Sequence, residues 1–248
     1  MTGQPPRVAL VTNVLAHYRV LCFDHLARAL DQQLTVYLLA SDMEHRRYVL
    51  APETQDLPLV HLPGWRWRRP PGDDRHLNDI RPVLRAPWQA IILGAWDEPT
   101  HLLLWAWAVA RRRKIIFWIE STAVDLPRHP AKEAFKRLLL GRATACMVPG
   151  RRASEYCQQL GVDEQRIFQA PNATDRTYFR SHADQLSPRR AELRQARGLE
   201  GLAILFVGRL VERYKGVETL LEACARLDQR GLAPTLLIAG EGPDEGHY

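Results

Sequence analysis

The sequence predicts an α/β protein with a Rossmann-like N-terminal domain and the beginning of a second domain of the same kind. Short apolar runs alternate with amphipathic stretches through residue 170. Most of these runs are nearly continuous rather than period-2 patterns, which is typical of parallel strands covered by helices on both faces of a sheet. After a polar stretch the same alternation starts again at residue 203, which indicates a second unit.

Each predicted strand of the first unit is a short run of mostly apolar residues. The strands cover residues 8–12 (VALVT), 34–39 (LTVYLL), 90–93 (AIIL), 114–119 (KIIFWI), 143–148 (ATACMV) and 167–170 (IFQA). Amphipathic stretches between them predict helices at residues 18–30, 100–112, 132–140 and 151–160. Gly161 suits the C-terminal cap of the last of these helices. The stretch 58–71, which contains WRWRRPP, is not periodic, and we interpret it as an irregular loop.

The second unit is predicted to contain a strand at residues 203–207 (AILFV), a helix at 216–229 and a strand at 235–239 (TLLIA). The polar, Arg-rich residues 174–201 are interpreted as an interdomain connection with a helix at 188–197. Because two strands make too small a sheet for a stable domain, we expect the second domain to be truncated.

Composition and charge narrow the class of protein. The chain has 248 residues, of which 46% are hydrophobic and 25% charged, the balance of a globular protein. The net charge of +6 indicates an anionic partner, or no specific partner at all. The sequence contains no helix-turn-helix, zinc-finger or RNP-like pattern, so we expect no nucleic acid. Four scattered cysteines indicate reduced thiols in a cytoplasmic protein, with no metal site.

The strongest chemical signal is the stretch FVGRLVERYKGVETLLEA. It places Gly208 and Arg209 at the end of a strand, and Lys215 and Gly216 at the start of a helix. The free N–H groups of a helix N-terminus attract anions, and guanidinium and ammonium groups bind phosphate oxygens. The alternative is an ordinary strand–helix turn with solvated basic side chains. The stretch IAGEGP after the next strand, which contains Glu241 and Gly242, favours the anion site.

This combination, GRLVERYKGVETLLEA followed by LLIAGEGP, resembles the second domain of family-4 glycosyltransferases, which have the GT-B fold. Pro171-Asn172, with Phe179 downstream, resembles the segment that leads into that domain, although Ala173 stands where the family usually has Gly. The resemblance makes residues 1–173 the acceptor-side domain, 174–201 the connection and 202–248 the start of the donor-binding domain.

The resemblance implies transfer of a hexosyl group from a nucleotide-diphosphate sugar to a glycan or lipid-linked acceptor, with retention of configuration and no dedicated metal. Arg209 and Lys215 would hold the donor diphosphate, and Gly208, Gly216, Glu241 and Gly242 would line the donor site. Two alternatives remain: a truncated, non-catalytic module that binds an acceptor or a membrane, and another Rossmann nucleotide-binding enzyme. The second is weakened because no GxGxxG follows a strand.

The chain departs from the family pattern in three places. TNVLAHYR follows the first strand without the usual glycines and offers His17, Tyr18 and Arg19 instead. Glu120-Ser121-Thr122 stands where relatives often carry a catalytic His, so no such His can be carried over. The paired glutamates that hold the donor in relatives would lie beyond Tyr248.

His17 and Glu120 are further candidates because each follows a strand, where ligands of open α/β sheets bind. Glu120 would bind acceptor hydroxyls or act as a base, or else cap the following turn. His17 would contact acceptor or donor, or else be an ordinary loop residue. We interpret Asp97 and Glu98 as favourable charges at a helix N-terminus.

The segment Trp65, Arg66, Trp67, Arg68 and Arg69 mixes indoles with guanidinium groups. It suits peripheral contact with the inner face of a membrane, stacking on a sugar, or a packed pair of indoles with solvated arginines.

Overall fold

The computed structural model describes residues 6–40, 57–67, 74–125 and 127–248 of the chain. It divides into two compact units, Met1–Thr174 and Asp175–Tyr248, and each is described here by itself. None of the helices in these ranges is long and apolar enough to cross a membrane.

The first unit is built on a seven-stranded sheet in the order β3-β2-β1-β6-β7-β8-β9, with every neighbouring pair parallel. Its strands are β1 (Val8–Thr12), β2 (Leu34–Leu38), β3 (Leu59–His61), β6 (Ala90–Leu93), β7 (Lys114–Trp118), β8 (Ala145–Val148) and β9 (Ile167–Gln169). All residues of β1 and β6, at the centre of the sheet, are buried. The predicted α/β fold with a parallel sheet is therefore confirmed.

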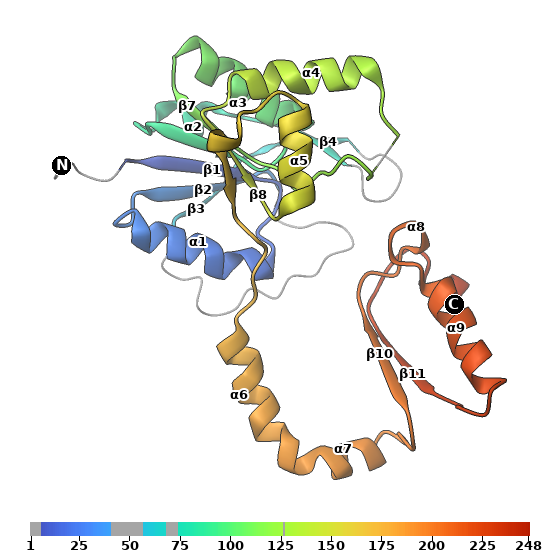
Figure 1. The fold of residues 1–248 in the computed structure, drawn as a ribbon. Coiled ribbons are helices and arrows are strands. Elements are labelled where there is room, and N and C mark those ends of the chain that lie inside the picture. Colours follow the sequence, from blue (N-terminus) through green and yellow to red (C-terminus); the bar gives the residue numbers. More distant parts are fainter. Residues whose placement is uncertain (1–5, 41–56, 68–73, 126) are drawn as a thin grey trace. The chain divides into compact units, whose positions relative to one another are not determined.

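Helices cover both faces of this sheet, as Figure 1 shows. They are α1 (His17–Ala29), α2 (Arg81–Arg85), α3 (Pro99–Ala110), α4 (Pro130–Gly141) and α5 (Arg151–Gln159). Helix α1 lies on one face, where Phe23 packs among strand residues such as Leu10 and Ile92. Helices α3, α4 and α5 lie on the other face, where Leu104, Leu139 and Tyr156 are buried. The backbone of Gly161, just after α5, has a positive φ of 90°, which suits its predicted capping position.

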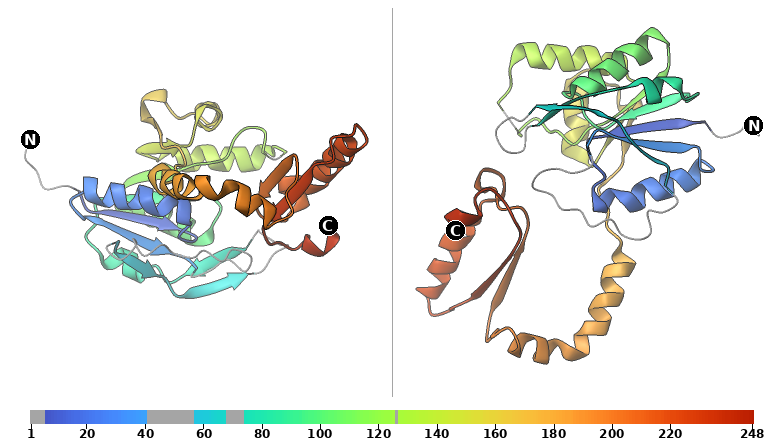
Figure 2. Two further views of the ribbon diagram at one scale, coloured as in Figure 1. Left: turned by 90° about the horizontal axis from the view of Figure 1, so that it is seen from below. Right: turned by 180° about the vertical axis from the view of Figure 1, so that it is seen from behind.

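The prediction of an irregular loop at residues 58–71 is wrong for its described part. Leu59–His61 forms edge strand β3, and Gly64–Trp67 forms β4, which pairs antiparallel with β5 (Arg75–Asn78). This hairpin is visible in Figure 2. Its register places Trp65 opposite Leu77 and Arg66 opposite His76. Residues 68–71 of the predicted loop lie outside the described residues.

The second unit starts with helices and continues with one β-α-β arrangement. Its elements are α6 (Arg176–Leu186), the short 3₁₀ helix η3 (Ser187–Arg189), α7 (Arg190–Gln195), β10 (Ala203–Val207), α8 (Glu212–Lys215), α9 (Val217–Asp228), β11 (Thr235–Ala239) and the 3₁₀ helix η4 (Glu245–His247). Strands β10 and β11 pair in parallel. The segment 174–201 holds two helices rather than the single predicted one, because Asp175 caps α6 through the N–H of Tyr178.

Candidate functional site

Three side chains meet at the carboxyl edge of the sheet in the first unit. Glu120, two residues after the end of β7, forms an ion pair with Arg19 from α1 and accepts a hydrogen bond from Asn172 Nδ2 at 3.1 Å. Both contacts use Oε1 of Glu120, so Oε2 has no hydrogen-bond partner within the described ranges. The predicted site residue Glu120 therefore presents an oriented carboxylate oxygen at a position where such sheets bind ligands.

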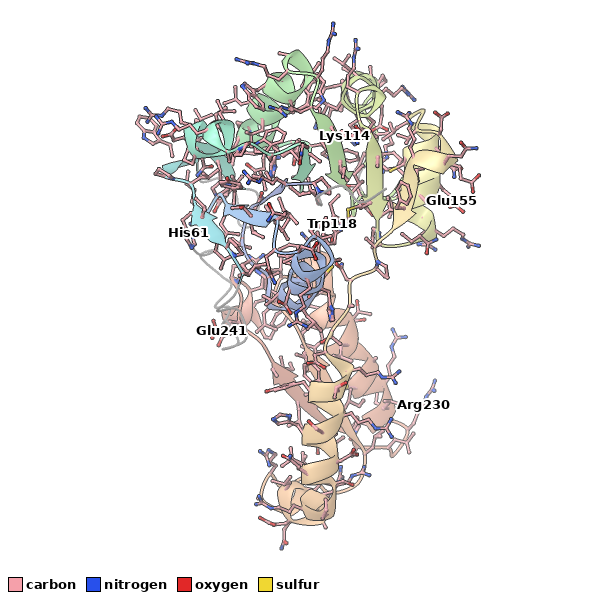
Figure 3. The ribbon with its side chains drawn as sticks, turned by 90° about the vertical axis from the view of Figure 1, so that its left-hand side faces the viewer. His61, Lys114, Trp118, Glu155, Arg230 and Glu241 are labelled. Atoms are coloured by element: carbon pink, nitrogen blue, oxygen red, sulfur yellow. The ribbon has the colours of Figure 1, made fainter. Side chains whose placement is uncertain are left out.

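Trp118, the last residue of β7, packs against Arg19 and supports this cluster of three side chains. Its ring lies 5.0 Å from the guanidinium of Arg19 and packs edge-on against Phe23, with ring centroids 5.9 Å apart. Figure 3 labels Trp118 beside α1. The indole supports the Arg19 guanidinium through a cation–π contact, so Arg19 is fixed between Trp118 and Glu120.

The loop that follows Glu120 is held by Arg128. Its guanidinium donates to the carbonyl oxygens of Thr122 and Ala123 and, at 2.7 Å, to the hydroxyl of Tyr156. Tyr156 in turn donates to Glu133 at 2.9 Å. Burial would raise the pKa of Glu133, but hydrogen bonds from Lys136 and Tyr156 and the neighbouring positive charges bring it below its usual value. This network orders the backbone next to Glu120.

The interpretation of Glu98 as a charge at a helix N-terminus agrees with its place as the N-cap residue of α3, but it leaves out what the side chain contacts. Glu98 immediately precedes α3, but its side chain makes no capping hydrogen bond and is almost fully buried. Its carboxylate instead accepts hydrogen bonds from the backbone N–H of His76 at 2.9 Å and from Asn13 Nδ2 at 3.0 Å. Asp97 forms an ion pair with Arg75 at 2.9 Å. The two carboxylates therefore tie the β4–β5 hairpin to the sheet.

The remaining candidates of the first unit are only partly described. The backbone of His17 begins α1, while its side chain lies outside the described part of the structure. Trp65 and Trp67 are exposed, and Arg66 forms an ion pair with Asp74 at 2.5 Å. Arg68 and Arg69 lie outside the described residues.

In the second unit, the candidate donor residues lie on the connection between β10 and α9. Gly208 and Arg209 follow β10 directly, with Arg209 half-buried, and Lys215 is the exposed last residue of α8. Gly216 precedes α9 with a φ of +61°, a left-handed conformation that glycine adopts without strain. The turn thus leads from a strand end to the N-terminus of a twelve-residue helix.

The N-terminus of α9 already holds a carboxylate from this connection. Glu212 Oε2 accepts the N–H of Glu218 at 2.9 Å and the hydroxyl of Tyr248 at 2.7 Å. These hydrogen bonds, with that of Glu218 the larger cause, hold the pKa of Glu212 below its usual value. The N–H of Glu212 itself donates to Asp244 Oδ2 at 2.8 Å. The helix end therefore binds an anionic oxygen.

The glycines after β11 allow two backbone segments to meet. A Cβ atom on Gly240 would overlap the carbonyl of Gly208, and one on Gly242 would overlap that of Leu210. The N–H of Leu210 donates to the carbonyl of Glu241 at 2.9 Å. Figure 3 labels Glu241, whose side chain is exposed. Gly242 thus has a packing role between the two predicted motifs.

The predicted residues therefore form two groups. His17 and Glu120 belong to the first unit, and Gly208, Arg209, Lys215, Gly216, Glu241 and Gly242 to the second. Sequence reasoning missed the contacts of Arg19, Asn172, Glu98 and Glu212. Arg19 and Asn172 stand in the motifs TNVLAHYR and Pro171-Asn172, but their contacts with Glu120 join positions 101 and 52 apart in sequence, which no local pattern indicates.

Solved structures share this fold. HepE of Anabaena in complex with UDP and glucose aligns with a TM-score of 0.57 at 13% identity, covering 96% of this chain and 61% of that chain. The UDP-N-acetylglucosamine 2-epimerase of Rickettsia bellii aligns with a TM-score of 0.52 at 11% identity, covering 98% of this chain and 64% of that chain. At these identities the likeness concerns the fold alone.

Residues 201–248, which include the β10–α9 connection, match the family described as "Glycosyl transferases group 1". The alpha-D-kanosaminyltransferase of Streptomyces kanamyceticus is 50% identical over 114 residues. The putative glycosyltransferase EpsF of Bacillus subtilis (strain 168) is 32% identical over 112 residues. Together with the fold, these matches support a GT-B glycosyltransferase.

The two transferase alignments cover 46% and 44% of this chain, and 28% of the length of each relative. The similarity in sequence to these two transferases thus extends over part of each protein, while the similarity in fold to the solved structures extends over nearly all of this chain.

Proposed function

We propose that this chain takes part in the transfer of a hexosyl group from a nucleotide-diphosphate sugar to a glycan or lipid-linked acceptor, with retention of configuration. The observation that carries the proposal is the match of residues 201–248 to the group 1 glycosyltransferases, because these residues also contain the glycine, arginine and lysine positions of the β10–α9 turn. HepE, which has the same fold, was solved with UDP and glucose.

On the donor side, the diphosphate would bind at the N-terminus of α9. The Glu212 carboxylate now accepts the N–H of Glu218 there, which supports an affinity of this helix end for anionic oxygens. Arg209 and Lys215 would compensate the negative charge that develops on the diphosphate as it leaves the sugar. A phosphate oxygen would then take the place of the Glu212 carboxylate.

On the acceptor side, Glu120 Oε2 would accept a hydrogen bond from an acceptor hydroxyl. Arg19 and Asn172 bind the other oxygen and so fix the direction of the carboxylate. We propose that the oriented carboxylate positions an acceptor hydroxyl and so lowers the entropic cost of bringing acceptor and donor together.

We also propose that the protein acts in cell-surface polysaccharide assembly on the cytoplasmic side, with peripheral membrane contact through residues 65–69. The exposed indoles of Trp65 and Trp67 support such a contact, because indole rings favour the membrane interface. The similarity to transferases over residues 201–248 favours an enzyme over a non-catalytic binding module.

The test is transfer of labelled sugar from a panel of nucleotide-diphosphate sugars in the presence of a membrane extract that supplies acceptors. We expect a product from one donor, and a loss of about 10²–10³ in turnover with Arg209→Ala. Arg230→Ala, on an exposed side chain after α9 (Figure 3), is the matched control. Unchanged turnover of the Arg209 variant would overturn the assigned role.

A further inference from the structure

A row of cationic side chains lies at the amino-terminal edge of the sheet in the first unit, opposite the edge that carries the candidate acceptor site. It comprises Arg7 before β1, residues 111–114 (RRRK) from the end of α3 to the first residue of β7, and Arg142 after α4, and all of these residues are exposed. We call them together the basic edge. The segment 99–119, which contains the RRRK run, has no aspartate or glutamate.

Backbone hydrogen bonds join the starts of the strands next to these side chains. The N–H of Gln89 donates to the carbonyl of Arg7 at 2.9 Å, and the N–H of Lys114, labelled in Figure 3, donates to the carbonyl of Gln89 at 3.3 Å. The N–H of Thr144, just before β8, donates to the carbonyl of Ile115 at 2.7 Å. Because β1, β6, β7 and β8 are neighbours in the sheet, the cations of the basic edge follow one another along its centre.

The backbone of Arg112 is left-handed, with a φ of 52°. Its N–H donates to the carbonyl of Val109 at 3.1 Å, and the N–H of Arg113 donates to that of Ala108 at 2.9 Å, the Schellman pattern at a helix end. Glycine is the usual residue at this position, because a Cβ atom disfavours the left-handed conformation. Arg112 therefore occupies this position at a conformational cost, which points to a role for its side chain outside the helix end.

The dipole of α3 accounts for part of the charge. A cation near the C-terminal end of a helix is stabilised by the dipole, and Arg111 caps α3 at this end. The effect falls off within the last turn of the helix. Arg113 and Lys114 already lead into β7, so the helix dipole does not explain why the positive charge continues there.

Two guanidinium groups of the basic edge rest against indole rings. The guanidinium of Arg111 lies 5.9 Å from the centre of the Trp107 ring, and that of Arg113 lies 5.8 Å from the Trp88 ring. Such contacts restrict the guanidinium groups and reduce the entropy lost when a ligand binds. Trp88 is buried and Trp107 half-buried, with ring centroids 5.1 Å apart. These indoles are therefore poorly placed to stack on the bases of a nucleic acid.

The exposed indoles of the first unit that are proposed above as a membrane contact lie on the β4–β5 hairpin. This hairpin is attached at the opposite ends of the strands, because Asn78 donates to the carbonyl of Leu39, just after β2, and to that of Leu62, just after β3. A bilayer that contacts the hairpin is therefore not expected to contact the basic edge as well. Guanidinium groups also bind carboxylates through paired hydrogen bonds, which favours an acidic polypeptide as the partner.

We propose that the basic edge is a docking surface for an acidic polypeptide segment of a partner protein, with residues 111–114 at its centre. The carboxylates of the partner pair with the guanidinium groups of Arg111, Arg112 and Arg113 and with the ammonium group of Lys114. This role is separate from sugar transfer. The choice of a polypeptide over a bilayer rests on the proposed membrane contact of the hairpin, and the experiment below tests that choice directly.

The test is a titration of the ¹⁵N-labelled full chain with poly-L-glutamate, followed by amide chemical shifts. We expect shifts concentrated at residues 111–114 and at Arg142, and weaker binding as the salt concentration rises. The double variant Arg112→Gly with Lys114→Gln is expected to weaken binding about three- to tenfold, the range for two exposed ion pairs. Thermal unfolding checks its fold, and no loss of stability is expected at position 112 because glycine suits the left-handed backbone.

Two control variants separate charge from backbone and from overall charge. Arg112→Lys keeps both the charge and the left-handed residue, and it is expected to bind nearly like the wild type. Arg151→Gln with Arg152→Gln removes the same charge from exposed side chains at the start of α5, at the other edge of the sheet, and is also expected to bind like the wild type.

Vesicles of phosphatidylcholine and phosphatidylglycerol, and poly-uridylate, are the competing probes for a bilayer and a nucleic acid. The Arg112→Gly, Lys114→Gln variant is expected to lose less binding to either of them than to poly-L-glutamate. A larger loss with vesicles or with poly-uridylate would overturn the assignment to an acidic polypeptide. Absence of shifts at the basic edge, or an equal loss in the Arg151, Arg152 control, would overturn the docking surface itself.

Discussion

Gly240 lies so close to Gly208 that a Cβ atom on Gly240 would overlap the Gly208 carbonyl oxygen. The N–H of Gly208 also donates to the carbonyl of Ala239 at 3.0 Å. The two glycines come from the two motifs that resemble the donor-binding domain, and their contact brings the ends of β10 and β11 together. The absence of a side chain at Gly240 is therefore a packing requirement.

The substitution Gly240→Ala is expected to destabilise the second unit by about 1–3 kcal/mol, the usual cost of inserting a methyl group into a tight contact. All seven tryptophans lie in the first unit, so hydrogen exchange of the β10 and β11 amides is the suitable measurement. Gly246→Ala is the control, because a Cβ there meets nothing within 4 Å. Equal exchange rates in both variants would contradict the packing requirement.

His101 is expected to make the stability of the first unit depend on pH. The ring is fully buried, with Nε2 3.2 Å from the carbonyl oxygen of Val11, and burial lowers the pKa of His101 to about 4. The unfolded chain, with a histidine pKa of about 6.5, binds the proton more tightly than the folded chain. The free energy of unfolding is therefore expected to fall as pH drops from about 6.5 toward 4, by at most about 3 kcal/mol.

Urea unfolding followed by tryptophan fluorescence between these pH values measures this loss. Glu98 acts in the same direction as His101. Burial alone would raise the pKa of Glu98, but hydrogen bonds and charges from His76 and His101 outweigh burial and hold it below its usual value of 4.5. The contribution of Glu98 to stability is therefore lost only as the pH falls below that value. The variant His101→Gln keeps a donor near Val11 and is expected to flatten the profile. A wild-type slope identical to that of the variant would show that His101 is not the titrating group.

Membrane contact through residues 65–69 is expected to depend on the two indoles and on the arginines that follow them in the sequence. Wild-type protein should float with vesicles of phosphatidylcholine and phosphatidylglycerol, because indoles enter the interface and arginines attract anionic lipid. Replacing Trp65, Trp67, Arg68 and Arg69 by Ser should release it, and this variant keeps the Arg66–Asp74 ion pair. Phe135→Ser with Leu138→Ser, on exposed residues of α4, is the control. Flotation of the hairpin variant at the wild-type level would reject this contact.

The sheet of the first unit was predictable because buried parallel strands are continuous apolar runs, as in β1 and β6. The β4–β5 hairpin was not. Its alternation of Trp65, Arg66 and Trp67 has the period of a strand, but the half-buried Arg66 forms an ion pair with Asp74, the residue just before the other strand. A sequence shows neither that partner nor the register that brings it close.

The candidate site was predictable where a residue has a local signal in the sequence, and not where its partners are distant in sequence. The position of Glu120 after a strand and the motif around Arg209 could be recognised locally. The contacts of Glu98 could not, because its neighbours in sequence are those of a helix N-terminus, while His76 lies 22 residues away and approaches only through the hairpin. A buried carboxylate with distant partners has no local signature.

The most direct test of the donor site is a titration of the ¹⁵N-labelled chain with UDP-glucose, followed by amide chemical shifts. We expect shifts concentrated at residues 208–218 and 240–242, with at least about tenfold weaker binding in Arg209→Ala and unchanged binding in Arg230→Ala. Absence of shifts at these residues with about 5 mM ligand, or equal shifts in the Arg209 variant, would contradict it.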